Sequence, residues 1–374
     1  MADVRDYLDW RGDLSFKADA FNEIDALILS QFAYLDFTGI IKEGFELALP
    51  MKEIGKRYFA AHGPEESKNL TILLSNCEGI TRKMILSDRF KRLYAFNYVD
   101  KYDSEESIQF SAVTIKIDNK KLFVAFRGTD DSLAGWQEDF KLCYMTPVQA
   151  QLEAVEYLKE VCEWWDGEVI LGGHSKGGNL AIYATMQLEE HLQAKVTQIY
   201  SFDGPGFLKD IVETEAYKRV IDRTITFLPQ GSYVGMIMYN TGVMKVVKST
   251  NKGFMQHAPV SWQIRGKNFE NSTIENYSLL FNECTKNWVD KIDSDKKEQF
   301  INSVFYLLKS GEMETFTEMS TEIPQVINRI LRSYAELDKE TKKMMRSIMM
   351  EAIKIGTITI KQNRIDGRKE ENGV

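Results

Sequence analysis

A serine and a histidine stand side by side between glycines in the stretch "LGGHSKGGNLA", which runs from Leu171 to Ala181. Its residues Gly173 to Gly177 fit G-x-S-x-G, the pattern of a nucleophilic serine on a tight turn between a strand and a helix. The two glycines avoid clashes between these elements, and the helix N-terminus favours developing negative charge. The flanking "EVIL" and "GNLAIYATM" are typical of a buried strand and a helix. We therefore predict that Ser175 is a nucleophile; the alternative is a glycine-rich turn with a helix-capping serine.

A serine that attacks a carbonyl needs two N–H donors to hold the developing oxyanion. One donor usually belongs to the residue after the nucleophile, here Lys176, and the other to the loop after an earlier strand. The segment "FVAFRGTDD" supplies such a loop, because an apolar strand run precedes Gly128 and Thr129. Gly128 permits a close backbone approach, and the amide and hydroxyl of Thr129 can both face an oxyanion. An ordinary polar turn is the alternative interpretation.

The general base must be one of four histidines. His62 precedes the predicted sheet, and His191 lies at the end of the helix that follows the serine. His174 belongs to the tight turn and points away from Ser175. His257 follows the last predicted strand, which gives the chain order serine, acid, histidine. Elimination predicts His257 as the base; a loop histidine without a role is the alternative.

The acid that orients the base is predicted from the ends of two strands. Asp203, in "YSFDGPGF", directly follows the strand after the serine turn. The next strand ends in "LPQGSYVG", which has no carboxylate and carries Ser232 instead, while Asp222 precedes that strand at its opposite end. We predict Asp203 as the acid; a structural role, bonding turn amides beside Gly204 and Gly206, stays open. This chemistry requires no metal and no organic cofactor.

Alternating strand and helix patterns must position these residues. The segment "SIQFSAVTIKIDNKKLFVAFRG" predicts a hairpin, and "EVILGG", "KVTQIYSF", "RTITFLP" and "GVMKVVKS" predict four further strands. Helical patterns separate most of them, as in "TPVQAQLEAVEYLKEVCEWW". Such alternation predicts an α/β fold with a mostly parallel central sheet that helices flank on both faces.

Both ends of the chain have a more helical pattern. Residues 1–70 look mostly helical, and we assign residues 1–264 to one α/β domain. After about residue 265 the strands largely stop, so residues 265–374 are predicted as a helical cap or accessory segment. Its methionines, Met344, Met345, Met349 and Met350, form a stripe that is more often core than a surface for a partner or a lipid.

Composition and charge narrow the class of protein. The chain has 374 residues, 44% of them hydrophobic and 27% charged, as in soluble globular proteins. The net charge of −8 argues against a general nucleic-acid binder, which needs a basic surface. No signal peptide or apolar run of membrane-spanning length is recognisable, so we expect a cytoplasmic protein. The four cysteines include no CxxC pair, which makes a zinc site improbable.

Together these motifs resemble those of the α/β-hydrolases, and among them the class 3, fungal-type lipases. The oxyanion strand in that family is similar to Val124–Asp131 with Trp136, Asp139 and Phe140, and its serine turn is similar to "GHSKGG". The segments "SQFAYLDF", "FDGPGF" and "QHAPVSW" are similar to those of a bacterial group of hydrolase-like proteins without an assigned substrate. The resemblance spans roughly residues 25 to 265 and implies the α/β-hydrolase fold and a serine hydrolase site at Ser175 and His257.

One residue departs from the lipase pattern. Those lipases carry an aspartate after the penultimate strand, where this chain has Ser232. Some α/β-hydrolases carry the acid one strand earlier, which is the place of Asp203. We expect a serine esterase or lipase-like hydrolase acting on a small-molecule or lipid ester. A hydrolase-fold protein without activity, serving as a binding or scaffold module, is the alternative, and a peptidase on the same scaffold has no distinguishing feature in the sequence.

Overall fold

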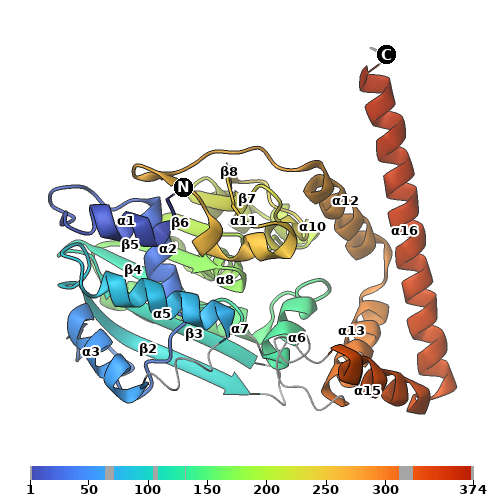
Figure 1. Cartoon of the computed structure of the whole chain (residues 1–374), viewed down its shortest axis with the longest axis horizontal. Coiled ribbons are helices and arrows are strands. Elements are labelled where there is room, and N and C mark those ends of the chain that lie inside the picture. The colour runs from blue at the N-terminus through green and yellow to red at the C-terminus, as the bar shows by residue number, and fades with distance from the viewer. Residues whose placement is uncertain (1, 64–70, 104–107, 131, 311–322, 372–374) are drawn as a thin grey trace.

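The computed structural model describes residues 2–63, 71–103, 108–130, 132–310 and 323–371. Its centre is an eight-stranded sheet in which the strands follow one another in chain order (Figure 1). The first four strands pair antiparallel, and every pair from β4 to β8 is parallel. The strands are β1 (Leu49–Pro50), β2 (Tyr94–Asp103), β3 (Ile108–Lys116), β4 (Lys121–Phe126), β5 (Glu168–His174), β6 (Val196–Phe202), β7 (Thr224–Pro229) and β8 (Val243–Val247).

Helices cover both faces of this sheet because its central strands are apolar on both sides. In β4, Phe123 and Ala125 belong to one hydrophobic core, and Leu122, Val124 and Phe126 belong to the other. Successive side chains of a strand point to opposite faces, so one continuous apolar run supplies both cores.

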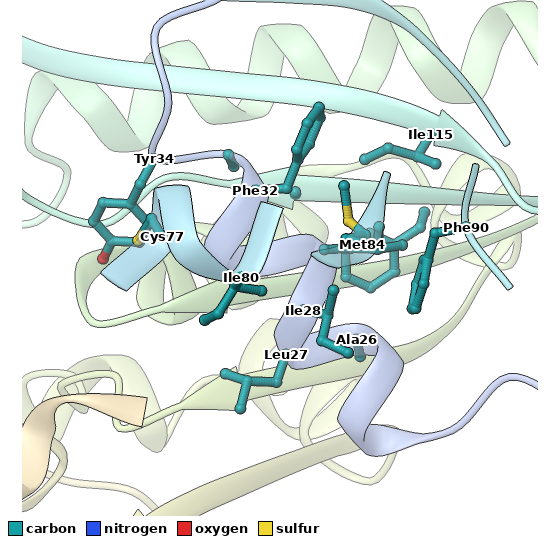
Figure 2. Packing of buried hydrophobic residues seen from close by; sticks show 14 of the residues in the cluster. Ala26, Leu27, Ile28, Phe32, Tyr34, Cys77, Ile80, Met84, Phe90 and Ile115 are labelled. Atoms are coloured by element: carbon teal, nitrogen blue, oxygen red, sulfur yellow. The ribbon is translucent and has the colours of Figure 1, made fainter. Parts of the chain in front are cut away.

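The first core lies under the N-terminal helices. Figure 2 shows its packing, with Leu27 and Ile28 of one helix beside Ile80 and Met84 of another. All four side chains are buried. The helices on this face are α1 (Val4–Arg11), α2 (Glu23–Phe32), α3 (Met51–Ala61) and α5 (Ile72–Met84).

The second core lies under helices that connect the parallel strands. Leu158 and Val161 of one helix pack with Leu180 and Ala184 of the helix that follows the serine turn. These crossover helices are α7 (Gln149–Trp164), α8 (Lys176–Gln187), α9 (Glu190–Gln193), α10 (Lys209–Val212) and α11 (Glu215–Ile221).

The C-terminal helices form a separate group at one side of the sheet (Figure 1). They are α12 (Asn276–Lys291), α13 (Ser294–Ser310), α15 (Ile323–Glu336) and the long α16 (Lys339–Glu371), which runs alongside α12. Buried Ile301 and Phe305 of α13 pack with Leu133 of α6 (Leu133–Lys141), the helix after the β4 loop. A small second sheet pairs β9 (Ile264–Arg265) with β10 (Asn268–Phe269).

The predicted fold class is confirmed: the arrangement is an α/β-hydrolase fold with a helical C-terminal segment. Strands β1 and β2, which extend the sheet beyond the predicted hairpin, were not predicted from the sequence. The prediction that the methionine stripe is core was wrong in part. Met345 is buried, but Met349 and Met350 are 53% and 65% exposed.

Candidate active site

The serine turn has a backbone conformation that few residues adopt. Ser175 has φ 57° and ψ −134° between the end of β5 and the start of α8. A Cβ at Gly173 would lie 2.1 Å from the backbone carbon of Gly177, and one at Gly177 would lie 2.2 Å from the carbonyl oxygen of Phe126. Both positions therefore require glycine, as expected for a nucleophile turn squeezed between a strand and a helix.

The polar residues of the site gather where neighbouring strands end. Ser175 follows β5, Asp203 follows β6 and Ser232 lies three residues beyond β7. Thr129 comes three residues after β4, the strand on the other side of β5. In an open parallel sheet the carboxyl ends of the strands share one edge, which is where ligands usually bind.

His257 and Asp203 are in direct contact. His257 lies at the end of a short 3-10 helix, Gly253–His257, and its Nδ1 is 2.7 Å from Oδ2 of Asp203. The carboxyl is fully buried, whereas the imidazole is 17% exposed. A carboxylate only accepts hydrogen bonds, so Nδ1 carries the proton and Nε2 is the ring nitrogen that can take another.

The Asp203 carboxylate also accepts hydrogen bonds from the loop that follows β7. Its Oδ1 accepts hydrogen bonds from the Ser232 hydroxyl at 2.5 Å and from the Gly235 amide at 3.1 Å. Ser232 stands where the lipase pattern has an aspartate, and here it donates to an aspartate one strand earlier. Asp203 itself has φ 53°, a left-handed conformation that turns its side chain at the strand end.

His174 is buried, and its ring bonds to the backbone of His257 and not to Ser175. Its Nε2 lies 2.9 Å from the carbonyl oxygen of His257, and its Nδ1 lies 2.9 Å from the Tyr34 hydroxyl. Because a carbonyl only accepts, Nε2 donates, and the neutral ring then accepts from Tyr34 at Nδ1. Burial, together with nearby His257, lowers the pKa of His174 well below its ordinary value, which fits this neutral form. His174 thus fixes the position of His257.

The Ser175 hydroxyl and the His257 ring, both among the described residues, are not joined by a hydrogen bond. Catalytic hydrogen bonds are often long in unliganded enzymes and tighten when substrate binds. The contact from His174 to His257 keeps the His257 imidazole beside the serine turn, since the two imidazole centroids are 4.4 Å apart.

The remaining histidines lie elsewhere. His62 ends α3 and stacks on Tyr58, with ring centroids 4.3 Å apart. His191 does not end the helix after the serine, as the sequence analysis had it: that helix stops at Gln187, and His191 belongs to the separate helix α9. Its side chain is 69% exposed.

The predicted oxyanion loop packs directly on the serine turn. A Cβ at Gly128 would lie 2.3 Å from the His174 carbonyl oxygen and 3.0 Å from Cβ of Ser175, so only glycine fits. The Thr129 hydroxyl is 2.5 Å from Oδ2 of Asp139. A hydroxyl has one hydrogen, so a hydroxyl that donates to Asp139 leaves the amide of Thr129 as the donor for an oxyanion.

The second predicted donor is the amide of Lys176. Lys176 is the first residue of α8, and the first N–H groups of a helix have no acceptor within the helix. The positive end of the helix dipole adds to this site. Its side chain, in contrast, is fully buried and reaches Glu138 of α6, with Nζ 2.7 Å from Oε2. Glu138 was not predicted from the sequence, because nothing in "QEDF" shows that its carboxylate pairs with the lysine of the serine turn.

Ser175 opens into an apolar pocket of about 700 Å³. Most of the residues that line the pocket come from α6, from the segment after β7 and from α12 and α13. The residues that line it are Trp136, Asp139, Phe140, Cys143, Ser175, Pro205, Tyr233, Val234, Ile237, Met238, Phe254, Phe281, Thr285, Trp288, Val289, Phe300 and Ile301. The C-terminal helices thus form part of the wall beside the serine.

The part of the chain that the structure describes offers neither a metal site nor a membrane-spanning helix. Within the described residues, no group of three or more His, Cys, Asp or Glu side chains is arranged to hold a metal ion. None of the described helices combines the length and the apolar character needed to cross a bilayer.

The fold and this serine turn define a chain of the α/β-hydrolase class. The chain belongs to the Mbeg1-like family, because the sequence model of that family matches residues 84–306, more than half of the chain. Among solved structures, it is similar to the Rhizomucor miehei lipase–propeptide complex, with 14% identity, a TM-score of 0.36 and coverage of 64% of this chain and 82% of that one. It is also similar to M37 lipase, with 14% identity, a TM-score of 0.34 and coverage of 58% and 69%. No curated protein gave a significant match.

Proposed function

We propose that this protein is a serine hydrolase that cleaves carboxylic esters with an apolar acyl group through an acyl-enzyme. The observation that carries the proposal is the contact between His257 and Asp203 at 2.7 Å, beside a serine on a strained turn. A base held by a buried acid next to a nucleophile is the arrangement that activates a hydroxyl.

In the first half-reaction, Ser175 Oγ attacks the ester carbonyl while His257 Nε2 takes the hydroxyl proton. The amides of Thr129 and Lys176 hold the oxyanion. The tetrahedral intermediate then collapses, and the proton on His257 passes to the departing alkoxide, which leaves as an alcohol. Asp203 keeps the imidazole oriented and stabilises its charged form.

In the second half-reaction, water attacks the acyl-enzyme and gives its proton to His257. The intermediate collapses again, the acid product leaves, and the proton returns to Ser175 Oγ. No step in this scheme requires a metal or an organic cofactor.

The pocket supports the choice of an apolar acyl group. Apart from Ser175, Asp139 and Thr285, the side chains that line it are apolar or aromatic. An acyl chain that leaves water for such a pocket gains up to about 0.8 kcal/mol for each buried methylene group. Residues 265–374 would then act as a cap, since α12 and α13 supply Phe281, Trp288 and Phe300 to the pocket wall.

The alternative of an inactive scaffold predicts a histidine without a carboxylate contact, and the His257–Asp203 contact disfavours it. The test is hydrolysis of p-nitrophenyl esters from acetate to decanoate. We expect kcat/KM to rise roughly two- to fourfold for each added methylene group until the pocket is filled. Ser175→Ala should abolish this hydrolysis. Equal activity of the parent protein and Ser175→Ala on every ester would contradict the proposal.

A further inference from the structure

The side chain of Lys176 plays no part in the proposed mechanism, yet it is fully buried directly behind the nucleophile. Its Nζ donates to Oε2 of Glu138 at 2.7 Å and to the backbone carbonyl of Gln109 at 3.0 Å. It also lies 3.6 Å from Oδ1 of Asp139. A buried ammonium is costly unless opposite charges and acceptors surround it, so this environment is built around the charge.

Glu138 fixes helix α6 to the rest of the fold. Its Oε1 accepts from the amide of Ala150 in α7 at 2.8 Å, and its Oε2 accepts from the amide of Gln109 in β3 at 3.3 Å. Lys176 adds the start of α8 to the same carboxylate. One buried cluster therefore joins α6, α7, β3 and the serine turn.

Asp139 connects this cluster to Thr129, in the predicted oxyanion loop after β4. Its Oδ2 accepts from the Thr129 hydroxyl, and its Oδ1 is a buried oxygen without a hydrogen-bond partner among the described residues. The Lys176 ammonium, 3.6 Å away, is the positive charge that compensates it. Burial raises the pKa of Asp139 to about 6, and the charge of Lys176 acts against that rise. The lysine thereby favours the ionised carboxylate, the form to which Thr129 donates.

We propose that Lys176 is a positioning residue: through Asp139 and Glu138 it holds Thr129 in place, so that the Thr129 amide stays aimed at the oxyanion. The inference rests on the proposed function, because an oxyanion arises only if Ser175 attacks a carbonyl. It extends that function by giving the lysine of the G-x-S-x-G turn a role beyond its backbone amide.

The test is a double-mutant cycle with Lys176→Met and Thr129→Val. Methionine has a similar length without the charge, and valine removes the hydroxyl that Asp139 holds. For Lys176→Met alone we expect kcat on p-nitrophenyl hexanoate to fall about 10- to 100-fold, with KM within threefold, as for the loss of an oxyanion donor. In the Thr129→Val background the same substitution should cost at most about threefold. Equal losses in both backgrounds would overturn the inference.

Lys195→Met is the control for removing a lysine ammonium that donates to backbone carbonyls far from the serine turn. Lys195 Nζ donates to the carbonyls of Cys162 and Trp165 at the opposite end of the sheet. The Lys195→Met variant should have a lower melting temperature than the parent protein and a kcat within twofold of the parent value. A similar fall in kcat would make the Lys176 effect one of general stability and overturn the inference.

Removing Lys176 leaves Glu138 unpaired, which can prevent folding. The cycle is therefore repeated with Glu138→Gln in every variant, so that Lys176→Met no longer leaves Glu138 as an unpaired buried charge. The same non-additivity is expected there, and additive losses would overturn the inference. If the parent protein hydrolyses no ester, the proposed function fails and this inference fails with it; if the parent is active and the losses are additive, only the inference about Lys176 fails.

Discussion

The Nδ1 atom of His257 lies 2.7 Å from Oδ2 of Asp203, although 54 residues separate them along the chain. Asp203 directly follows β6, and His257 lies in a loop beyond β8. Ser232, at the end of the intervening strand, donates to the other oxygen of the same carboxylate. The carboxylate one strand before the usual lipase position is therefore already in contact with an imidazole.

Asp203→Asn should lower kcat on p-nitrophenyl hexanoate by about 10³- to 10⁴-fold, because an amide cannot hold the imidazole in the required tautomer or stabilise its charge. Asp222→Asn is the control, since Asp222 is exposed at the opposite end of β7 and should keep activity within twofold. Steady-state kinetics of the two purified variants makes the comparison. Retention of more than a tenth of the parent activity in Asp203→Asn would remove it from the mechanism.

Gly128→Ala should abolish most activity, with at least about a 100-fold loss in kcat/KM. An added Cβ would lie 2.2 Å from the Tyr34 hydroxyl and 2.3 Å from the His174 carbonyl oxygen, so the loop must move away from Ser175. Loss of one oxyanion donor alone costs about 10²- to 10³-fold.

Gly79→Ala is the matched control for that substitution. Gly79 lies within α5, and an added Cβ has no atom within 4 Å. Alanine there should raise the unfolding free energy by about 0.5–1 kcal/mol and leave activity unchanged. Equal activity of the Gly128 and Gly79 variants would show that the loop does not need its observed position.

Asp139→Asn should change stability in a pH-dependent way. Burial raises the pKa of Asp139 to about 6, from an ordinary value of 3.8. A raised pKa means that the folded state prefers the protonated acid. The contribution of Asp139 to the free energy of unfolding is therefore full below about pH 4 and is lost as the pH rises through 6. Asparagine never ionises. The variant's unfolding free energy relative to the parent should therefore improve by about 1–3 kcal/mol between pH 4 and pH 7.5.

Urea unfolding of both proteins at the two pH values measures this difference. If the difference in unfolding free energy between the two proteins is the same at both pH values, or if the variant is relatively less stable at pH 7.5, the assigned environment of Asp139 is contradicted. Activity need not follow stability here, because the same carboxylate holds Thr129.

Thr285→Phe should shorten the acyl chain that the protein accepts. Thr285 lines the same pocket as Ser175 from α12, and a phenyl group there would fill part of that pocket. We expect kcat/KM for the octanoate ester to fall about tenfold or more while that for the acetate ester stays within threefold. Leu279→Phe, on the same helix and 46% exposed, should change neither value. Equal effects on both esters would mean that this pocket does not bind the acyl chain.

The sequence allowed the sheet and the serine turn to be predicted because local patterns specify both. The apolar run of β4 and the flanks of Ser175 depend on neighbours within a few residues, and the turn's glycines are required by contacts that the pattern implies. Strand β2 was missed because its last four residues, Asp100 to Asp103, are exposed and three of them are charged, so its apolar pattern is short.

The hydrogen-bond partners of the site residues could not be predicted from the sequence, because they come from segments far apart in the chain. Asp203 could equally have bonded only turn amides, since nothing in "FDGPGF" reveals a histidine 54 residues later. The burial of Lys176 could not be predicted either, because it also depends on a residue that is distant in the chain. Its charge is compensated by Glu138 from a helix 38 residues earlier in the chain, and surface lysines are far more common than buried ones.

The central claim is that Ser175 is a nucleophile activated by His257. The most direct measurement is labelling of the folded protein with a fluorophosphonate probe, followed by mass spectrometry of the peptide that carries the adduct. The account predicts one adduct on Ser175 in the parent protein, none in Ser175→Ala, and labelling slowed by at least about 100-fold in His257→Ala. An adduct that persists in Ser175→Ala, or a parent protein that takes up no probe, would contradict it.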